Sequence, residues 1–176
     1  MRLPFRKLVF IFSGLAIIGA GFFFGKTNIV QASVKEGQKF GDWAVTCVKD
    51  NNSKQLCLLN QQSQITKDDK TQVLAVYQVG YVGNDKKLVM VQILPLGSLI
   101  QPGTAIISNE KLLAAGKFTT CSSQGCQALA EISENDLKEI LNSNQSLIGY
   151  VNAEGNQVSV PFSSKGLKEG LAALKK

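Results

Sequence analysis

The sequence predicts a mainly β fold, an antiparallel β-sandwich or barrel-like sheet with two short α-helices and two disulfide bonds. Three observations indicate this class. About eight short segments alternate apolar and polar residues and are separated by turn-forming residues. Only two segments have helical periodicity, and no β-α-β rhythm is present. Four cysteines form two pairs of near neighbours in the sequence.

The first 32 residues have the features of a secretory signal. A basic start, "MRLPFRK", precedes an apolar run from Leu8 to Phe24, and Val30-Gln31-Ala32 fits a small-residue cleavage site. We therefore expect residues 1–32 to be a cleaved signal peptide. The apolar run has 17 residues, which is near the lower limit of a membrane-spanning helix, so an uncleaved anchor is the alternative. In both cases the rest of the chain is exported.

Removal of this segment changes what the charge implies. The whole chain has 19 basic and 13 acidic residues, but four of the basic residues and none of the acidic ones precede residue 33. The remaining 15 basic residues are scattered lysines, so no argument for nucleic-acid binding is left. Residues 33–176 have the length of one domain, and no repeat or linker divides them.

The cysteines predict disulfides, because an even number in an exported chain is typical of an oxidised framework. They are Cys47, Cys57, Cys121 and Cys126. Three pairings are possible, and the turn-forming residues within each near pair favour Cys47–Cys57 and Cys121–Cys126. We expect Gly125 to adopt a positive φ in the tight second turn. The spacing and the absence of histidine argue against a zinc or redox site, so no metal or cofactor is expected.

The first predicted strand covers residues 39–48, where Trp43, Val45 and Cys47 share one side. The segment "TKDDKT", residues 66–71, is expected to be a solvated loop. Further strands are expected over 55–65, 71–82, 86–96, 103–109, 116–121 and 125–132, with a terminal hairpin over 146–163 that turns at 153–156.

Two segments predict helices. In residues 132–144, Ser133 is the expected N-cap, and acidic residues follow it in the first turn. In residues 163–176, three leucines at helical spacing form an apolar stripe, which predicts a helix that packs on the sheet.

Residues 33–176 contain neither histidine nor arginine, which excludes Ser-His-Asp and Cys-His catalysis and an arginine clamp on phosphate. No phosphate-binding loop or metalloprotease motif is present either. Asp42 is a candidate catalytic carboxylate, although a turn at a strand end is the commoner role. Trp43 is a candidate for stacking on a ligand, although its place in an alternating strand favours the core. We therefore expect no enzyme activity.

Five segments occur in an order that is similar to one known family. They are "FGDWAVTC", "LLNQQ", "LPLGSLIQPGTAI", "FTTCSSQGCQA" and "VSVPFSSKGLKEGLAAL". Together they resemble the invasion-associated locus B family of exported bacterial proteins, over residues 40–174. The motif F-x-D-W-x-x-x-C falls on Phe40, Asp42, Trp43 and Cys47, and the motif C-x-x-x-x-C falls on Cys121, Gly125 and Cys126.

The resemblance implies a β-rich protein of a Gram-negative bacterium that is periplasmic, outer-membrane-associated or secreted. In some pathogens such proteins are associated with entry into host cells. Our first hypothesis is a non-enzymatic envelope or surface protein that binds an unknown envelope or host-surface component. The second is a periplasmic structural or stress-support binding protein, and the third is a carboxylate-dependent periplasmic hydrolase. Membrane contact is expected only through the signal segment or by peripheral association.

Overall fold

The computed structural model describes residues 34–49 and 55–175 of the chain. The expected signal peptide, residues 1–32, lies outside the described residues, and so does the turn expected between the first two cysteines. The described residues contain ten strands and two helices. The predicted mainly β class with two short helices is therefore confirmed.

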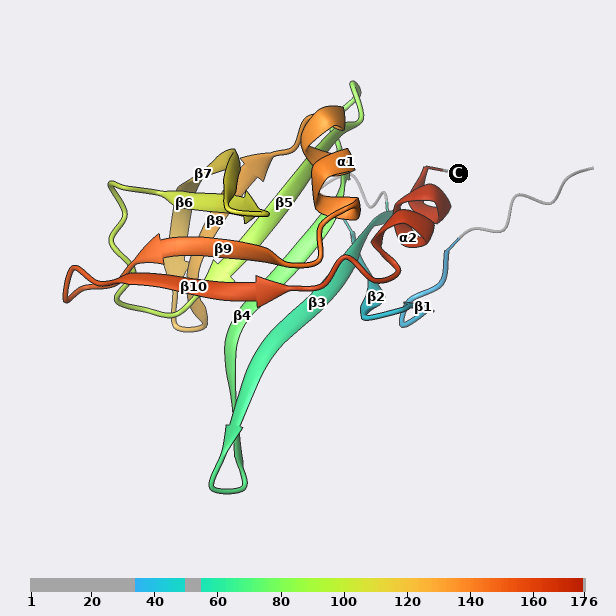
Figure 1. Ribbon diagram of the computed structural model, residues 1–176. Coiled ribbons are helices and arrows are strands. Elements are labelled where there is room, and N and C mark those ends of the chain that lie inside the picture. Colours follow the sequence, from blue (N-terminus) through green and yellow to red (C-terminus); the bar gives the residue numbers. More distant parts are fainter. Residues whose placement is uncertain (1–33, 50–54, 176) are drawn as a thin grey trace, which may run out of the picture. The chain divides into compact units, whose positions relative to one another are not determined.

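The strands form one antiparallel sheet in the order β1-β2-β3-β4-β5-β8-β7-β6-β9-β10 (Figure 1). Most neighbours in this order are sequence neighbours, as expected for strands joined by short turns. The strands are β1 (Lys39–Phe40), β2 (Trp43–Lys49), β3 (Gln55–Lys67), β4 (Lys70–Val82), β5 (Lys87–Leu94), β6 (Thr104–Ser108), β7 (Lys111–Ser122), β8 (Gly125–Glu131), β9 (Ser146–Val151) and β10 (Gln157–Phe162).

Strand β7 turns the sheet back on itself. Its first half pairs with β6, its second half, from Lys117, pairs with β8, and Gly116 lies at the change. A Cβ on Gly116 would lie 2.2 Å from the Thr104 hydroxyl, so only glycine fits where the strand bends. The two expected alternatives, sandwich and barrel, are thus resolved as one folded sheet that is not closed into a barrel.

The inward side chains of both halves of this folded sheet form the core. Period-two alternation places them there, since every second residue of a strand points to the same face. Trp43 and Val45 of β2 are each 1% exposed, which confirms the expected inward side of that strand. The largest other buried side chains are Leu59, Tyr77, Met90, Leu94, Ile106, Ile140, Ile148 and Leu167.

The two helices cover edges of this core. Helix α1 (Glu134–Leu141) begins at the predicted N-cap Ser133, whose hydroxyl accepts a hydrogen bond from the backbone N–H of Asp136 at 3.1 Å. Helix α2 (Leu167–Leu174) packs against β1, β2, β3 and β4 (Figure 1). Gly170 of α2 lies directly on Leu59 of β3, because a Cβ there would be 2.6 Å from a Leu59 methyl group.

Both predicted disulfides are present, Cys47–Cys57 and Cys121–Cys126, and no described cysteine is free. Each joins two residues that face each other directly across an antiparallel pair, β2–β3 and β7–β8. Each bond therefore fixes the register of one hairpin. Gly125, in the second hairpin, has a φ of +134°, and a Cβ there would lie 2.4 Å from the Leu94 carbonyl oxygen. The expected need for glycine at this turn is confirmed.

The β3–β4 hairpin differs from the prediction. Both strands extend past the expected ends, and the segment predicted as a solvated loop is a two-residue turn at Asp68 and Asp69. Both residues have a positive φ, +49° and +58°. Asp tolerates this conformation better than most residues, which lets the strands continue to the tip. The hairpin projects away from the rest of the sheet (Figure 1).

Candidate functional site

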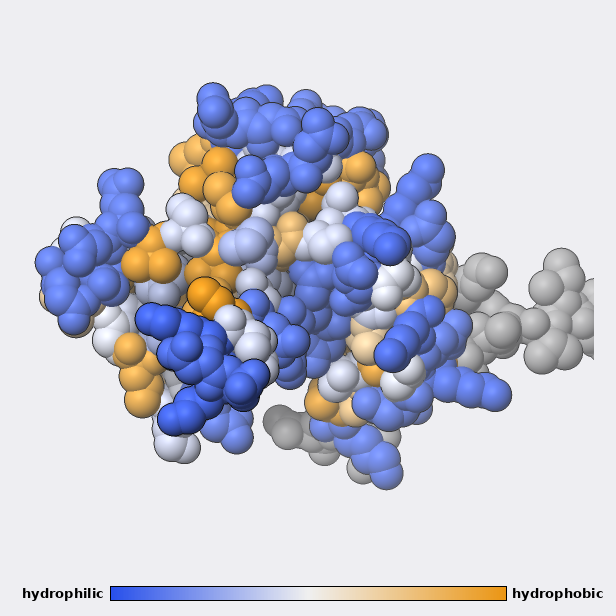
Figure 2. Space-filling model, turned by 60° about the horizontal axis from the view of Figure 1, so that its bottom comes forward, coloured by the Kyte–Doolittle hydropathy of each residue, from blue (hydrophilic) through white to orange (hydrophobic). Residues whose placement is uncertain are grey.

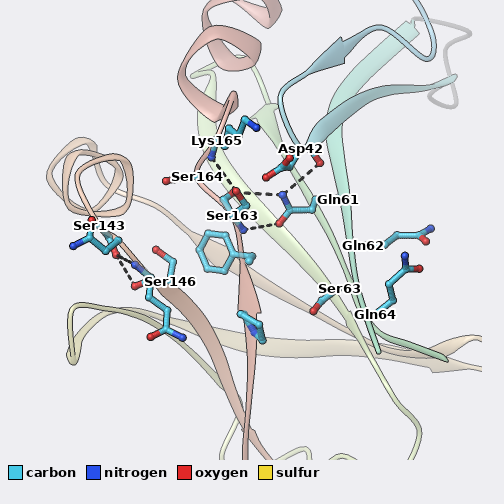
Figure 3. Close-up of a pocket in the computed structure, with 14 residues that line it drawn as sticks. Asp42, Gln61, Gln62, Ser63, Gln64, Ser143, Ser146, Ser163, Ser164 and Lys165 are labelled. Carbon is cyan, nitrogen blue, oxygen red and sulfur yellow. Dashed lines mark hydrogen bonds between the residues drawn. The ribbon is translucent and has the colours of Figure 1, made fainter. Parts of the chain in front are cut away.

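A cleft of about 590 Å³ lies where the two ends of the folded sheet approach each other without pairing. One wall is the part of β3 that starts at Gln61, and the opposite wall is the end of β10 with the segment that follows it (Figure 3). The loop between α1 and β9 forms the remaining side. The lining residues are Asp42, Gln61, Gln62, Ser63, Gln64, Ser143, Asn144, Gln145, Ser146, Pro161, Phe162, Ser163, Ser164 and Lys165.

The Gln61 side chain joins the two walls of the cleft. Its Oε1 accepts a hydrogen bond from the backbone N–H of Ser163 at 2.8 Å. Its Nε2 lies 3.5 Å from the Ser163 carbonyl oxygen and 3.4 Å from that of Asp42. One amide thus pairs with both the N–H and the C=O of Ser163, as a neighbouring strand would. We call this contact the Gln61 clamp (Figure 3).

The indole of Trp43 also binds Ser163. The ring is buried, and its Nε1 donates a hydrogen bond to the Ser163 carbonyl oxygen at 2.9 Å. A buried indole N–H needs such a partner, and the Ser163 carbonyl supplies it. Trp43 is therefore a core residue, as the alternation favoured, and it does not present a face for ligand stacking.

Asp42 lies in the turn between β1 and β2, with its side chain exposed at the cleft. Its backbone N–H donates to the Lys165 carbonyl oxygen at 3.1 Å. Beside it, a Cβ on Gly166 would lie 2.1 Å from the Phe40 carbonyl oxygen, so the two backbone segments touch. The expected turn position of Asp42 is confirmed. The structure thereby brings three motif residues, Phe40, Asp42 and Trp43, against the segment after β10.

The cysteines and Gly125 do not line this cleft. Gly125 and the Cys121–Cys126 bond belong to the β7–β8 turn, and the Cys47–Cys57 bond lies in the β2–β3 hairpin. Their roles are in the fold. The C-x-x-x-x-C motif is thus structural, whereas the F-x-D-W-x-x-x-C motif also shapes the cleft.

The chemistry of the cleft is that of neutral hydrogen-bonding groups. Five glutamine or asparagine residues and five serines are among its lining residues, and the side chains of Gln62 and Gln64 point away from Ser163 (Figure 3). Among the described lining residues Asp42 is the only acid and Lys165 the only base. Within residues 34–49 and 55–175, no three histidine, cysteine or acidic side chains lie close enough together to hold a metal ion. The arrangement is suited to recognising a polar chain through hydrogen bonds.

A second groove, of about 350 Å³, lies on the outer face of β6, β7, β9 and β10. Its floor is apolar, with Ile107, Leu112, Gly149 and Val151 among its lining residues, and Leu112 is 62% exposed. The face of the molecule drawn in Figure 2 has apolar patches between hydrophilic groups. None of the described helices is long and apolar enough to cross a membrane.

Sequence reasoning missed the Gln61 clamp. A glutamine in a strand carries no periodic or charge signal, and its partner Ser163 is 102 residues away. The only signal is that both lie in segments that carry the family resemblance, "LLNQQ" and "VSVPFSS".

Comparisons with known proteins agree with this fold. The crystal structure of invasion associated protein B from Bartonella henselae is similar to the chain, with a TM-score of 0.64 and 16% identity, over 78% of this chain and 93% of that one. No curated protein matches the chain in sequence. The family model described as "Invasion associated locus B (IalB) protein" matches residues 43–175. The chain therefore belongs to the invasion associated locus B family.

Proposed function

We propose that the protein is exported and acts in the bacterial envelope or at the cell surface by binding another molecule, in support of host-cell interaction or invasion. Family membership and the secretory features of residues 1–32 support export. The two disulfides support it further, because such bonds persist in oxidising compartments outside the cytosol. In this proposal, residues 33–176 form the mature single domain.

The observation that carries the binding role is the cleft. It is open to solvent, and its amides and hydroxyls come from three separate parts of the fold, which the Gln61 clamp and α1 hold in place. Hydrolysis by paired carboxylates needs a second acid opposite the first. Asp42 has no such partner among the described residues that line the cleft. This favours binding over the hydrolase hypothesis.

The binding role is tested with purified protein and host cells or isolated outer envelope. Asn144→Lys and Gln145→Lys place charge on exposed positions that line the cleft, and Gln101→Lys places the same charge on an exposed loop outside it. We expect both cleft variants to weaken binding by roughly tenfold and the loop variant to leave it unchanged. Equal binding by all four proteins would contradict the role of the cleft.

Localisation is tested by fractionation and by protease treatment of intact cells. Digestion of the protein on intact cells supports the surface role. Strict retention in the periplasm would instead favour a structural or stress-support binding protein, which would use the same cleft for an envelope component.

A further inference from the structure

Part of β3 has a free edge that runs along the cleft. The pairing of β2 with β3 ends at Ala44 and Asn60, because the chain enters the β1–β2 turn just before Trp43. From Gln61 to Lys67, β3 therefore pairs only with β4 among the described strands. Its other edge has backbone N–H and C=O groups that point away from β4, and such an edge can pair with another strand.

This edge lacks the features that usually prevent strand pairing. Residues 61–66, "QQSQIT", contain no proline and no charge. Three other edges of the sheet have such features. Strand β10 contains Pro161, β1 has only two residues, and the outer edge of β4 near the tip has a bulge where Leu74 is the extra residue. An unprotected edge beside protected ones indicates a surface that is kept open for pairing.

We propose that this edge pairs with the same edge of a second copy of the chain, antiparallel, with the two-fold axis at Ile65. In this register Ile65 faces its own counterpart, Gln64 faces Thr66 and Ser63 faces Lys67. Ile65 is 50% exposed in the single chain, and this arrangement covers it with an identical apolar side chain. The edge is complementary to itself, because amides and hydroxyls both donate and accept hydrogen bonds.

The cleft accommodates the rest of the second copy's hairpin. Because the pairing is antiparallel, the second copy's tip, residues 67–70, lies beside Gln62 and the β1–β2 turn. The tip has the charge order Lys-Asp-Asp-Lys, and the cleft offers Asp42 and Lys165 at that end. Opposite charges can therefore pair at both ends of the dimer. Figure 2 brings the end of this hairpin forward and shows strongly hydrophilic side chains there.

This inference goes beyond the proposed host-cell binding, because it names a second copy of the chain as the occupant of the cleft. A two-stranded hairpin with both edges exposed is only marginally stable on its own. Pairing with a second copy would therefore stabilise the projecting hairpin. The dimer is isologous, so each copy supplies one arm and one cleft.

The first test measures the mass of the purified full chain by light scattering and sedimentation over a range of concentrations. Ile65→Lys places a charge at the proposed axis. Val73→Lys is the matched control, because Val73 lies on the same hairpin and is 44% exposed, but on β4. We expect dimers of the wild type and of Val73→Lys, and at least a roughly tenfold weaker dimer for Ile65→Lys. A monomeric wild type, or the same result for both variants, overturns the proposal.

The second test replaces the same two residues, Ile65 and Val73, with cysteine. Directly opposite residues of an antiparallel pair have Cα atoms about 4.5–5.5 Å apart, within disulfide range. Both native disulfides join opposite residues in this way, with Cα atoms 4.0 Å apart. Ile65→Cys should therefore form a covalent dimer on oxidation, with the new bond shown by peptide mapping, and Val73→Cys should not. Absence of the Ile65→Cys bond overturns the register even if the lysine variants fail to fold.

The two proposals fail separately. If the wild type is monomeric but the cleft variants lose host-cell binding, self-pairing is wrong and the binding role stands. If Ile65→Cys crosslinks but the cleft variants bind host cells normally, the dimer stands and the binding role fails.

Discussion

Replacing Gln61 with methionine isolates the contribution of the clamp. Methionine has nearly the same length and shape as glutamine, so the buried position stays filled while the hydrogen bonds of the amide are lost. Gln61 is 8% exposed, whereas its neighbour Gln62 is exposed, and the side chain of Gln62 forms no hydrogen bond with the described residues. Gln62→Met is therefore the matched control.

The size of the effect follows from which groups lose a partner. The backbone N–H of Ser163 loses its 2.8 Å bond to Oε1, which stabilises by about 1 kcal/mol net. An orphaned donor adds about 1–3 kcal/mol when it is fully buried, and Ser163 is half-buried, so the low end applies. The Ser163 carbonyl keeps its bond from Trp43, and the two Nε2 contacts are long. The burial of an apolar group offsets part of this loss. We expect a net loss of about 1–2 kcal/mol.

Urea unfolding measures this difference as a change in midpoint at constant slope. The control should lie within about 0.5 kcal/mol of the wild type. Amide hydrogen exchange locates the effect, because the N–H of Ser163 should exchange faster in Gln61→Met and not in Gln62→Met. Equal stabilities of the two variants, with unchanged exchange at Ser163, would refute the clamp.

Four further predictions concern the rest of the fold. Gly170→Ala should destabilise by about 1–2 kcal/mol in urea unfolding, because overpacking on Leu59 exceeds the gain of up to about 1 kcal/mol in helix propensity; a stabilised variant would contradict this. Glu110 has a φ of +63° in the β6–β7 turn, so Glu110→Gly should raise stability by about 1 kcal/mol, and a lowered melting temperature would count against it. Burial raises the pKa of Tyr77 above its usual 10.0, so the contribution of Tyr77 to the unfolding free energy should be constant through neutral pH and fall above about pH 10; an equally steep fall in Tyr77→Phe would show that another group is responsible. Loss of the Cys121–Cys126 bond, whose cysteines have a sequence separation of 5, should cost about 2 kcal/mol and no more than loss of the other disulfide, and the reverse order in thermal unfolding would disprove the loop-length argument.

Local patterns were sufficient to predict most elements of the fold. Alternation around Trp43 gave the inward side of β2, Ser133 gave the start of α1, and turn residues between near cysteines gave both disulfide pairings. Each of these features depends on residues within about ten positions of each other. The hairpin tip was missed because Asp-Asp is an unusual pair at a turn that needs two positive φ values.

The cleft could not be predicted, because it depends on contacts between distant segments. Asp42 was recognised as a turn residue, but its contact with Lys165 spans most of the domain. The choice between sandwich and barrel depended on the bend of β7 at Gly116, and a glycine within a strand can equally mark a bulge or a close backbone contact. Topology of this kind is set by packing of the whole core rather than by a local signal.

The long-range contacts of the last fifteen residues also impose an order on folding. In the export that we propose, the chain would emerge from its N-terminus. Each disulfide hairpin needs only the 11 or 6 residues that it contains, so both can form early. The first strands stay incomplete for longer, because Ser163 of the clamp and Leu167 and Leu171 of α2 arrive last. Until then, Trp43 and Leu59 are open to solvent, to proteases and to chaperones. Both disulfides can therefore form before the core is packed. Docking of the C-terminal helix is then the step that converts a crosslinked intermediate into the native domain.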